Sequence, residues 1–87
     1  MEKDAAYFAK RVRETLGDSS GKRFPDEFIA AALHETLTAY ERFFPVDWLA
    51  DDPFIHLPAP HEQLIVNGAS AAALRIRLRA VTEIHAQ

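Results

Sequence analysis

The chain has 87 residues, 48% of them hydrophobic and 26% charged, with a formal net charge of −3 and no cysteine. This length suits one domain, which we place over residues 1–87. The lack of cysteine excludes disulfides and thiolate metal sites. The acidic balance disfavours nucleic-acid binding, which usually requires a basic excess on one face.

The amino terminus and the apolar runs bear on where the protein is found. The first residues, MEKDAAYFAKRVRE, are charged throughout, unlike a signal peptide. No apolar run approaches the ~20 residues of a membrane span. We therefore expect a protein that is neither secreted nor held in a membrane. Its hydrophobic content is high for so small a domain, so either the core is unusually aromatic or part of the surface is buried against other chains.

The first predicted helix covers residues 2–16. Glu2 and Asp4 are predicted in its first turn, where negative charge complements the helix dipole. Gly17 is predicted to end the helix, and residues 18–21 (DSSG) are typical of a turn. The apolar residues recur every three or four positions, which is the spacing of one helix face: Ala5, Phe8, Val12 and Leu16.

The second predicted helix covers residues 25–43. Pro25 suits the first helical position, and acidic residues follow it at the positive end of the helix dipole. Pro45 is predicted to end the helix, because the residue before a proline avoids helical angles. A broad apolar stripe runs along this segment: Ile29, Ala32, Leu33, Leu37, Tyr40 and Phe44.

Residues 46–60 are predicted to be irregular. Residues 51–53 (DDP) are typical of a turn, and the prolines near the end of the segment exclude a continuous helix. We expect Trp48 and Leu49 to pack this loop against the rest of the domain.

The third predicted helix covers residues 61–85, and its second half carries two conflicting signals. Residues 74–81 (LRIRLRAV) alternate apolar and charged side chains, as a half-buried strand does. We favour a helix, because residues 69–73 (ASAAA) are strong helix formers and the chain offers no convincing partner strand. Such a helix is apolar on two sides, one of which is available to another subunit. Ile76 and Ala80 lie on one side, and Leu74, Leu78 and Val81 on the other.

These elements predict an all-α protein. We expect a small three-helix bundle, or a four-helix one, with an irregular proline-rich loop between the second and third helices. No internal repeat or low-complexity segment interrupts this pattern.

Catalytic and metal-binding motifs are weak in this sequence. The segment from His34 (HETLT) begins like the zinc motif His-Glu-x-x-His, but Thr38 occupies the position of the second ligand. We interpret His56 and His61 as ordinary loop and helix-start residues. Residues 17–22 (GDSSGK) lack the spacing of a phosphate-binding loop. We therefore predict no catalytic residues, no cofactor and no metal site.

Two groups of residues are candidates for an interface with other subunits. The first is aromatic and follows the second helix, where it either plugs the open end of the bundle or anchors a partner. The second is a series of arginines, which either lie solvated beside acidic residues or pair with a neighbouring subunit. The candidate interface residues are Phe43, Phe44, Trp48, Arg75, Arg77 and Arg79.

The segment from Arg11 to Pro45 resembles a known family. An arginine-bearing first helix ends in Leu-Gly-Asp and leads into Asp-x-x-Gly-x-x-Phe, an acidic helix start and a helix closed by proline. A Leu-Pro step at residues 57–58 then precedes the small-residue segment GASAAAL at 68–74. These features resemble the small head–tail connector proteins, also called adaptor or head-completion proteins, of tailed bacteriophages and prophages. The resemblance covers about residues 10–80.

The resemblance implies a non-enzymatic virion assembly protein. Such connectors are helical homo-oligomers that form a ring between portal and tail, with those phage proteins as partners and DNA passing non-specifically through the channel. Their place is the virion, or the bacterial cytoplasm during assembly.

Other classes stay open from the residues alone. One is a small helical dimeric interaction or regulatory module, and another is an enzyme whose site is composed across subunits. A helix-turn-helix DNA-binding protein is disfavoured, because residues 24–40 are acidic and lack the side chains that read bases.

Overall fold

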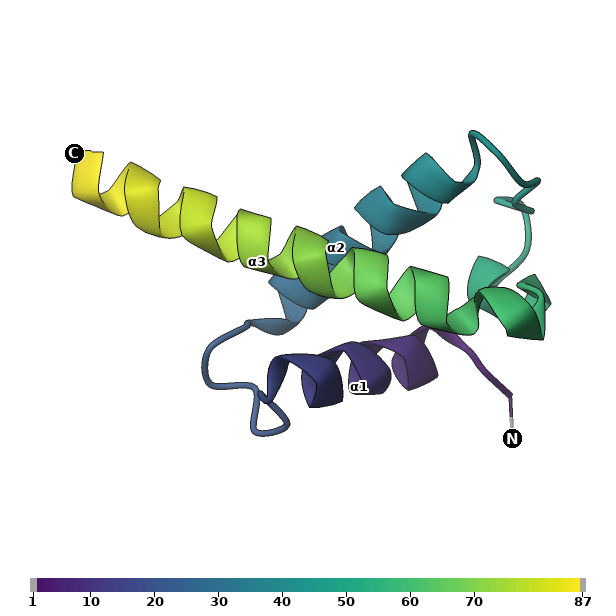
Figure 1. The fold of residues 1–87 in the computed structure, drawn as a ribbon, viewed down its shortest axis with the longest axis horizontal. Helices are drawn as coiled ribbons and strands as arrows, with labels where there is room; N and C mark the ends of the chain where they lie inside the picture. Colours follow the sequence, from purple (N-terminus) through teal and green to yellow (C-terminus); the bar gives the residue numbers. More distant parts are fainter. Residues whose placement is uncertain (1, 87) are drawn as a thin grey trace.

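The fold consists of three α-helices and two short 3₁₀-helices. The computed structural model describes residues 2–86, and every regular element in this range is helical. The prediction of an all-α protein with three helices is therefore confirmed. Residues 74–81 are helical, so the alternating arginines do not form a strand. In chain order the elements are α1 (Ala5–Leu16), α2 (Asp26–Tyr40), η1 (Pro53–His56), η2 (Ala59–His61) and α3 (Glu62–Ala86) (Figure 1).

Asp4 and Gly17 define the ends of α1. Asp4 has an extended backbone, and its carboxylate accepts a hydrogen bond from the backbone N–H of Tyr7 at 2.9 Å. It therefore caps the helix instead of lying in the first turn, and the helix begins at Ala5, later than predicted. Gly17 has φ 69°, the left-handed conformation that ends many helices, as its position predicted.

Helix α2 is shorter than predicted at both ends. Pro25 has an extended backbone and stands in the capping position, so the helix begins at Asp26 and not at the proline. It ends at Tyr40, and residues 41–44 form a turn in place of the predicted last helical turn. Pro45 keeps Phe44 out of helical angles and so prevents the helix from continuing beyond this turn.

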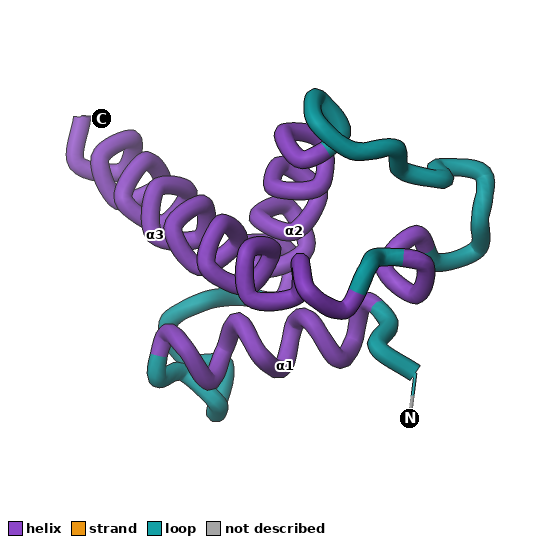
Figure 2. The backbone as a smooth tube through the Cα atoms, turned by 45° about the vertical axis from the view of Figure 1, so that its right-hand side comes forward, coloured by secondary structure: helices purple, strands orange, loops and turns teal. Residues whose placement is uncertain are grey.

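Helix α3 packs across both other helices and forms the core with them (Figure 2). Alanines 69, 72 and 73 in its middle are fully buried, and side chains this small let α2 approach closely. The two helices also approach closely at Gly68, where an added Cβ would lie 2.9 Å from the methyl group of Thr36. The largest fully buried side chains come from all three helices and the turn between α1 and α2: Phe8, Val12, Phe24, Ile29, Leu37, Ile65 and Val66.

Helix α3 is much longer than its partners. At 1.5 Å per residue, its 25 residues span about 37 Å, against about 18 Å for the 12 residues of α1. The longest dimension of the molecule is 41 Å, so α3 runs along most of it. Its carboxyl-terminal end lies beyond both α1 and α2 (Figure 1). The last turns of α3 therefore have few neighbours within the chain.

Candidate interaction surfaces

The turn between α1 and α2 is held by a buried carboxylate. Asp18 is 3% exposed, and its side chain accepts hydrogen bonds from the backbone N–H groups of Arg23 (3.2 Å) and Phe24 (2.9 Å). Its backbone carbonyl accepts the N–H of Gly21 at 3.0 Å, and the guanidinium of Arg13 lies 3.5 Å from its carboxylate. The Asp-x-x-Gly-x-x-Phe pattern therefore closes this turn and places the ring of Phe24 in the core.

Opposing effects set the pKa of the Asp18 carboxyl group. Burial raises this pKa, while the N–H donors of Arg23 and Phe24 and the charges of Arg23 and Arg13 lower it. The net result is a pKa below the usual value. The carboxylate is therefore ionised at neutral pH, and its hydrogen-bonding capacity is used within the turn.

A second charged cluster joins the amino-terminal segment to the start of α3. Glu62 accepts a hydrogen bond from the hydroxyl of Tyr7 at 2.7 Å, and it pairs with Lys3 at 2.6 Å and with Arg11. The bonds from Lys3 and Tyr7 lower the pKa of Glu62 against the effect of burial. Two cations and one hydroxyl thus engage a single carboxylate, and the cluster ties α1 and the residues before it to the start of α3.

The histidines that end η1 and η2 differ in their surroundings. The Nδ1 atom of His61 lies 2.7 Å from the hydroxyl of Tyr40, and its ring centroid lies 4.4 Å from that of Phe44. His56 is exposed in η1. Across the part of the chain that the structure describes, no three histidine, aspartate or glutamate side chains come close enough to hold a metal ion.

The predicted aromatic interface residues differ in exposure. Phe43 is 80% exposed. Phe44 stacks on Tyr40 with ring centroids 5.0 Å apart, and Trp48 packs on His34 at 5.5 Å. Phe44 and Trp48 thus hold the loop against α2, whereas Phe43 extends into solvent and is available to a partner.

Phe54 anchors the loop before α3. We expected Leu49 to pack this loop down, but it is 98% exposed, so that prediction is wrong. Phe54 is buried instead, with its ring centroid 5.3 Å from that of Phe8. The carboxylate of Asp52 caps η1 through the N–H of Phe54 and also accepts the N–H of the first residue of α1. The loop is therefore fastened to α1 by one ring and one carboxylate.

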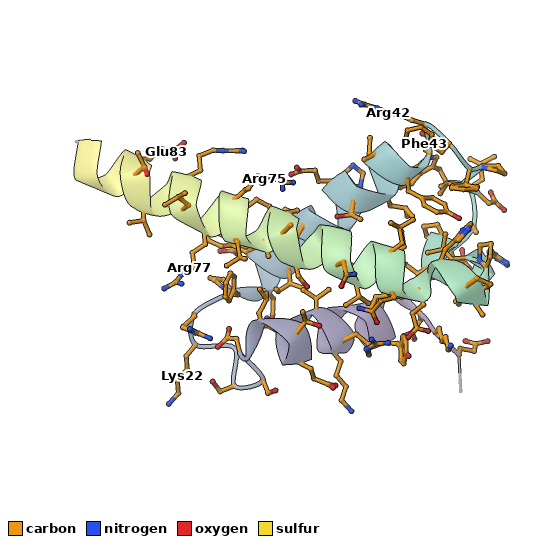
Figure 3. The ribbon with its side chains drawn as sticks, viewed as in Figure 1. Lys22, Arg42, Phe43, Arg75, Arg77 and Glu83 are labelled. Atoms are coloured by element: carbon orange, nitrogen blue, oxygen red, sulfur yellow. The ribbon has the colours of Figure 1, made fainter. Side chains whose placement is uncertain are left out.

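The three predicted arginines lie on the carboxyl-terminal half of α3. Arg75 pairs with a glutamate of α2 at 3.1 Å, Arg77 lies with its guanidinium 5.3 Å from the ring centroid of Phe24, and Arg79 is exposed. Figure 3 shows Arg75 and Arg77 on this half of α3, while Phe43 lies beyond the far end of α2. The structure therefore places the six predicted interface residues in two separate groups.

The outward side of α3 carries an exposed, mostly apolar row of residues, here called the outer seam. Its members alternate spacings of three and four residues, the heptad pattern typical of coiled-coil contacts. The opposite side of the helix, which includes Ile76, packs against the core. Helix α3 is thus apolar on two sides, and only one of them is covered within the chain. The outer seam consists of Leu64, Asn67, Ala71, Leu74, Leu78 and Val81, all exposed.

A groove of about 600 Å³ lies between α1 and α2, and no residue of α3 lines it. Trp48 lies at its rim, together with the charged residues Arg13, Asp26 and Asp51. Sequence reasoning missed this groove, because alanines in a helix indicate only good helix formation until the crossing of two helices is known. The walls are Ala5, Ala6, Ala9 and Ala30, and the floor includes Ile29, Leu33, Leu37 and Phe54.

Comparison with known proteins assigns no family to the chain. No protein-family model, no curated protein and no solved structure matches it. Among the described helices, none combines the length and apolar character needed to cross a membrane. The structure itself offers two candidate interaction surfaces, the outer seam of α3 and the groove between α1 and α2.

Proposed function

We propose that this protein is a non-enzymatic structural protein that assembles with copies of itself, as a head–tail connector of a tailed phage or prophage. The observation that carries the proposal is the outer seam, where Leu64, Leu74 and Leu78 are 56%, 52% and 68% exposed. A row of exposed apolar side chains on a small protein marks a contact surface, because covering it removes apolar area from water.

The state of the polar groups supports a structural role. Asp18 and Glu62 are bonded to several donors each, and His61 is bonded to Tyr40. Catalytic acids and bases need a free site beside a substrate, whereas these groups join elements of the fold to one another.

The connector form of the proposal rests on the sequence resemblance. The residues that carry it, Asp18, Gly21 and Phe24, close the turn between α1 and α2, so they belong to the architecture of this helix pair. A ring also suits a molecule with two different exposed surfaces, because contacts between unlike surfaces repeat head to tail. In such a ring the portal and tail proteins are the partners, and DNA passes through without specific contacts.

A small dimeric interaction module is the second candidate. The heptad spacing of the outer seam favours it, because residues at these positions form the contact of two-stranded coiled coils. Asn67 would be the one polar member, and a buried asparagine at such a position fixes the register of two helices. Two copies joined along their outer seams would form a closed dimer.

Negative-stain electron microscopy with native mass spectrometry separates these candidates. The connector is expected to form closed rings built from many 9.8 kDa subunits. A uniform dimer without rings would contradict the connector and support the interaction module.

A further inference from the structure

We propose that the carboxyl-terminal half of α3 in one copy docks into the groove between α1 and α2 of the next copy. This half, residues 74–83, is here called the α3 arm. The inference rests on the proposed self-assembly and deepens it by naming the two surfaces that meet. Both surfaces are open in the single chain, and they lie on different elements.

The groove has the lining that a docked helix requires. Its walls are alanines of α1 and α2, and such small side chains allow the ~8–10 Å axial distance of packed helices. Its floor includes Leu33 and Ile29, which are buried core residues. Leucine side chains entering the groove would therefore contact apolar atoms on three sides.

The α3 arm presents a ridge that suits this groove. Leu74, Leu78 and Val81 are separated by four and three residues, so they lie along one side of the helix. They are 52%, 68% and 43% exposed. The ridge is on the side of α3 that faces away from the core, and the carboxyl-terminal end of the arm lies beyond α1 and α2 (Figure 1), so the ridge is open to a second molecule.

The arm is basic along the edges of its ridge. Arg75 and Arg79 border the ridge on one side and Arg77 borders it on the other, as the helical spacing requires. Glu83 is the one acidic residue in the arm. Two arms placed side by side would bring like charges together, which disfavours their pairing with each other.

The rim of the groove is acidic on balance. Asp26 and Asp51 are both exposed there. The one arginine in the lining, Arg13, pairs with Asp26 at 2.6 Å and lies 3.5 Å from the buried Asp18. The charge of Asp51 is therefore the one in the rim that Arg13 does not offset. A basic arm therefore meets a rim of opposite sign, which favours the groove of a second copy as its occupied site.

This contact joins unlike surfaces, so each copy donates one arm and accepts another. Contacts of this type propagate and close into rings where the rotation between copies allows it. Pairing of two outer seams would instead be symmetric and would stop at a dimer. The two arrangements therefore respond differently to a change in the groove alone.

The test uses one variant for each surface. Leu78→Asp places a charge on the ridge of the arm, and Ala30→Trp fills the groove from its exposed wall. Each variant alone is expected to remain a monomer in light scattering. In a mixture, the intact arm of Ala30→Trp can enter the intact groove of Leu78→Asp, so the two are expected to form a 1:1 heterodimer that grows no further.

Matched controls keep the result specific. Ala31→Trp adds the same side chain at an exposed position of α2 outside the groove, and Leu49→Asp makes the same leucine-to-aspartate change at an exposed loop position outside both the outer seam and the groove lining. Both are expected to assemble like wild type. Ala6→Trp fills the groove from α1 and should behave like Ala30→Trp, and circular dichroism of every variant should show wild-type helix content.

The outcomes separate this inference from the proposed function. Wild-type assembly by Ala30→Trp and Ala6→Trp, or the absence of a heterodimer in the mixture, would overturn the docking of arm and groove while self-assembly stands. A wild-type protein that stays monomeric throughout would overturn self-assembly, and this inference with it.

Discussion

Asp18 carries a negative charge into the base of the turn between α1 and α2, where backbone N–H groups of the turn and the guanidinium of Arg13 from α1 stabilise it. The backbone N–H groups of Arg23 and Phe24 would have no partner without this carboxylate. Leaving buried N–H groups unpaired costs more than the bonds themselves contribute. The sequence predicted a turn at residues 18–21, but not a carboxylate that reaches six residues ahead, because local turn motifs span only two or three residues.

Replacing Asp18 with asparagine is expected to lower the melting temperature at neutral pH by about 5 °C or more. The amide supplies one acceptor where the carboxylate supplies two, and it loses the attraction to Arg13. Circular dichroism melting of both proteins from pH 7 to pH 2.5 measures the effect.

The pH dependence has a defined sign. The pKa of Asp18 is lower in the folded protein than its usual value, so the stability it contributes is complete above the unfolded pKa of about 3.9. That contribution is lost as the pH falls through the lower folded pKa. Wild type should therefore lose melting temperature below about pH 4, and Asp18→Asn should lose less.

Asp51→Asn is the control for this prediction, since Asp51 is exposed. It should melt like wild type at neutral pH. Equal melting temperatures for wild type and Asp18→Asn across the pH range would contradict the role of Asp18.

At the level of whole elements, the sequence predicted each helix but not all of its ends. Gly17 ends α1 as expected, whereas α2 ends at Tyr40, well before Pro45, so a proline sets the limit of a helix without fixing its last residue. Acidic residues are less informative, since Asp4 can serve as a cap or as a first-turn residue, and only the backbone angles decide between them. Residues 74–81 show a similar limit. Their alternating pattern is typical of a strand, and the helix is favoured because the chain offers no second strand to pair with it.

Gly68 lies where α2 and α3 cross, so its lack of a side chain has a structural reason. Gly68→Ala is expected to lower the free energy of unfolding by about 1 kcal/mol. Alanine favours the helix by about 1 kcal/mol, but overpacking against Thr36 costs roughly 1–3 kcal/mol. Urea denaturation of the single variant measures the difference.

The companion variant Thr36→Ala identifies the cause. Removing the threonine methyl leaves the new Cβ at ordinary contact distance. Combining the two changes should therefore restore stability, with a coupling free energy of about 1–2 kcal/mol. Additive effects of the two substitutions would show that the crossing is not tightly packed at this point.

For the whole molecule, composition indicated surplus apolar surface, but the fold was needed to locate it. The two apolar sides of α3 were visible in the spacing of Ile76 and Leu78. The groove was not visible in the sequence, because it depends on how far apart α1 and α2 lie in the folded chain. Two of the predicted interface residues, Phe44 and Trp48, pack the loop against α2. Sequence alone could not distinguish this packing role from a role in binding a partner.

Reversing two arginines tests the electrostatic part of assembly. Arg75→Glu with Arg79→Glu should reduce the assembled mass while leaving the melting temperature almost unchanged. Both side chains are exposed, and an exposed ion pair such as Arg75 with Glu35 contributes only about 0–1 kcal/mol to stability.

A charge-matched control uses Lys22→Glu with Arg42→Glu. These residues lie in other parts of the molecule, the first in the turn after α1 and the second after α2 (Figure 3). The control should assemble like wild type. Equal masses for the two double variants would assign no role in assembly to the arginines of α3.

Light scattering of the wild-type protein, from micromolar to near-millimolar concentration, tests most directly whether other copies cover the outer seam and the groove. The structure leads us to expect a mass above the 9.8 kDa of one chain, which reaches a plateau at a fixed multiple as concentration rises. Under the same conditions Leu78→Asp should remain at the mass of one chain. A wild-type mass of 9.8 kDa at every concentration would contradict self-assembly as the purpose of these surfaces.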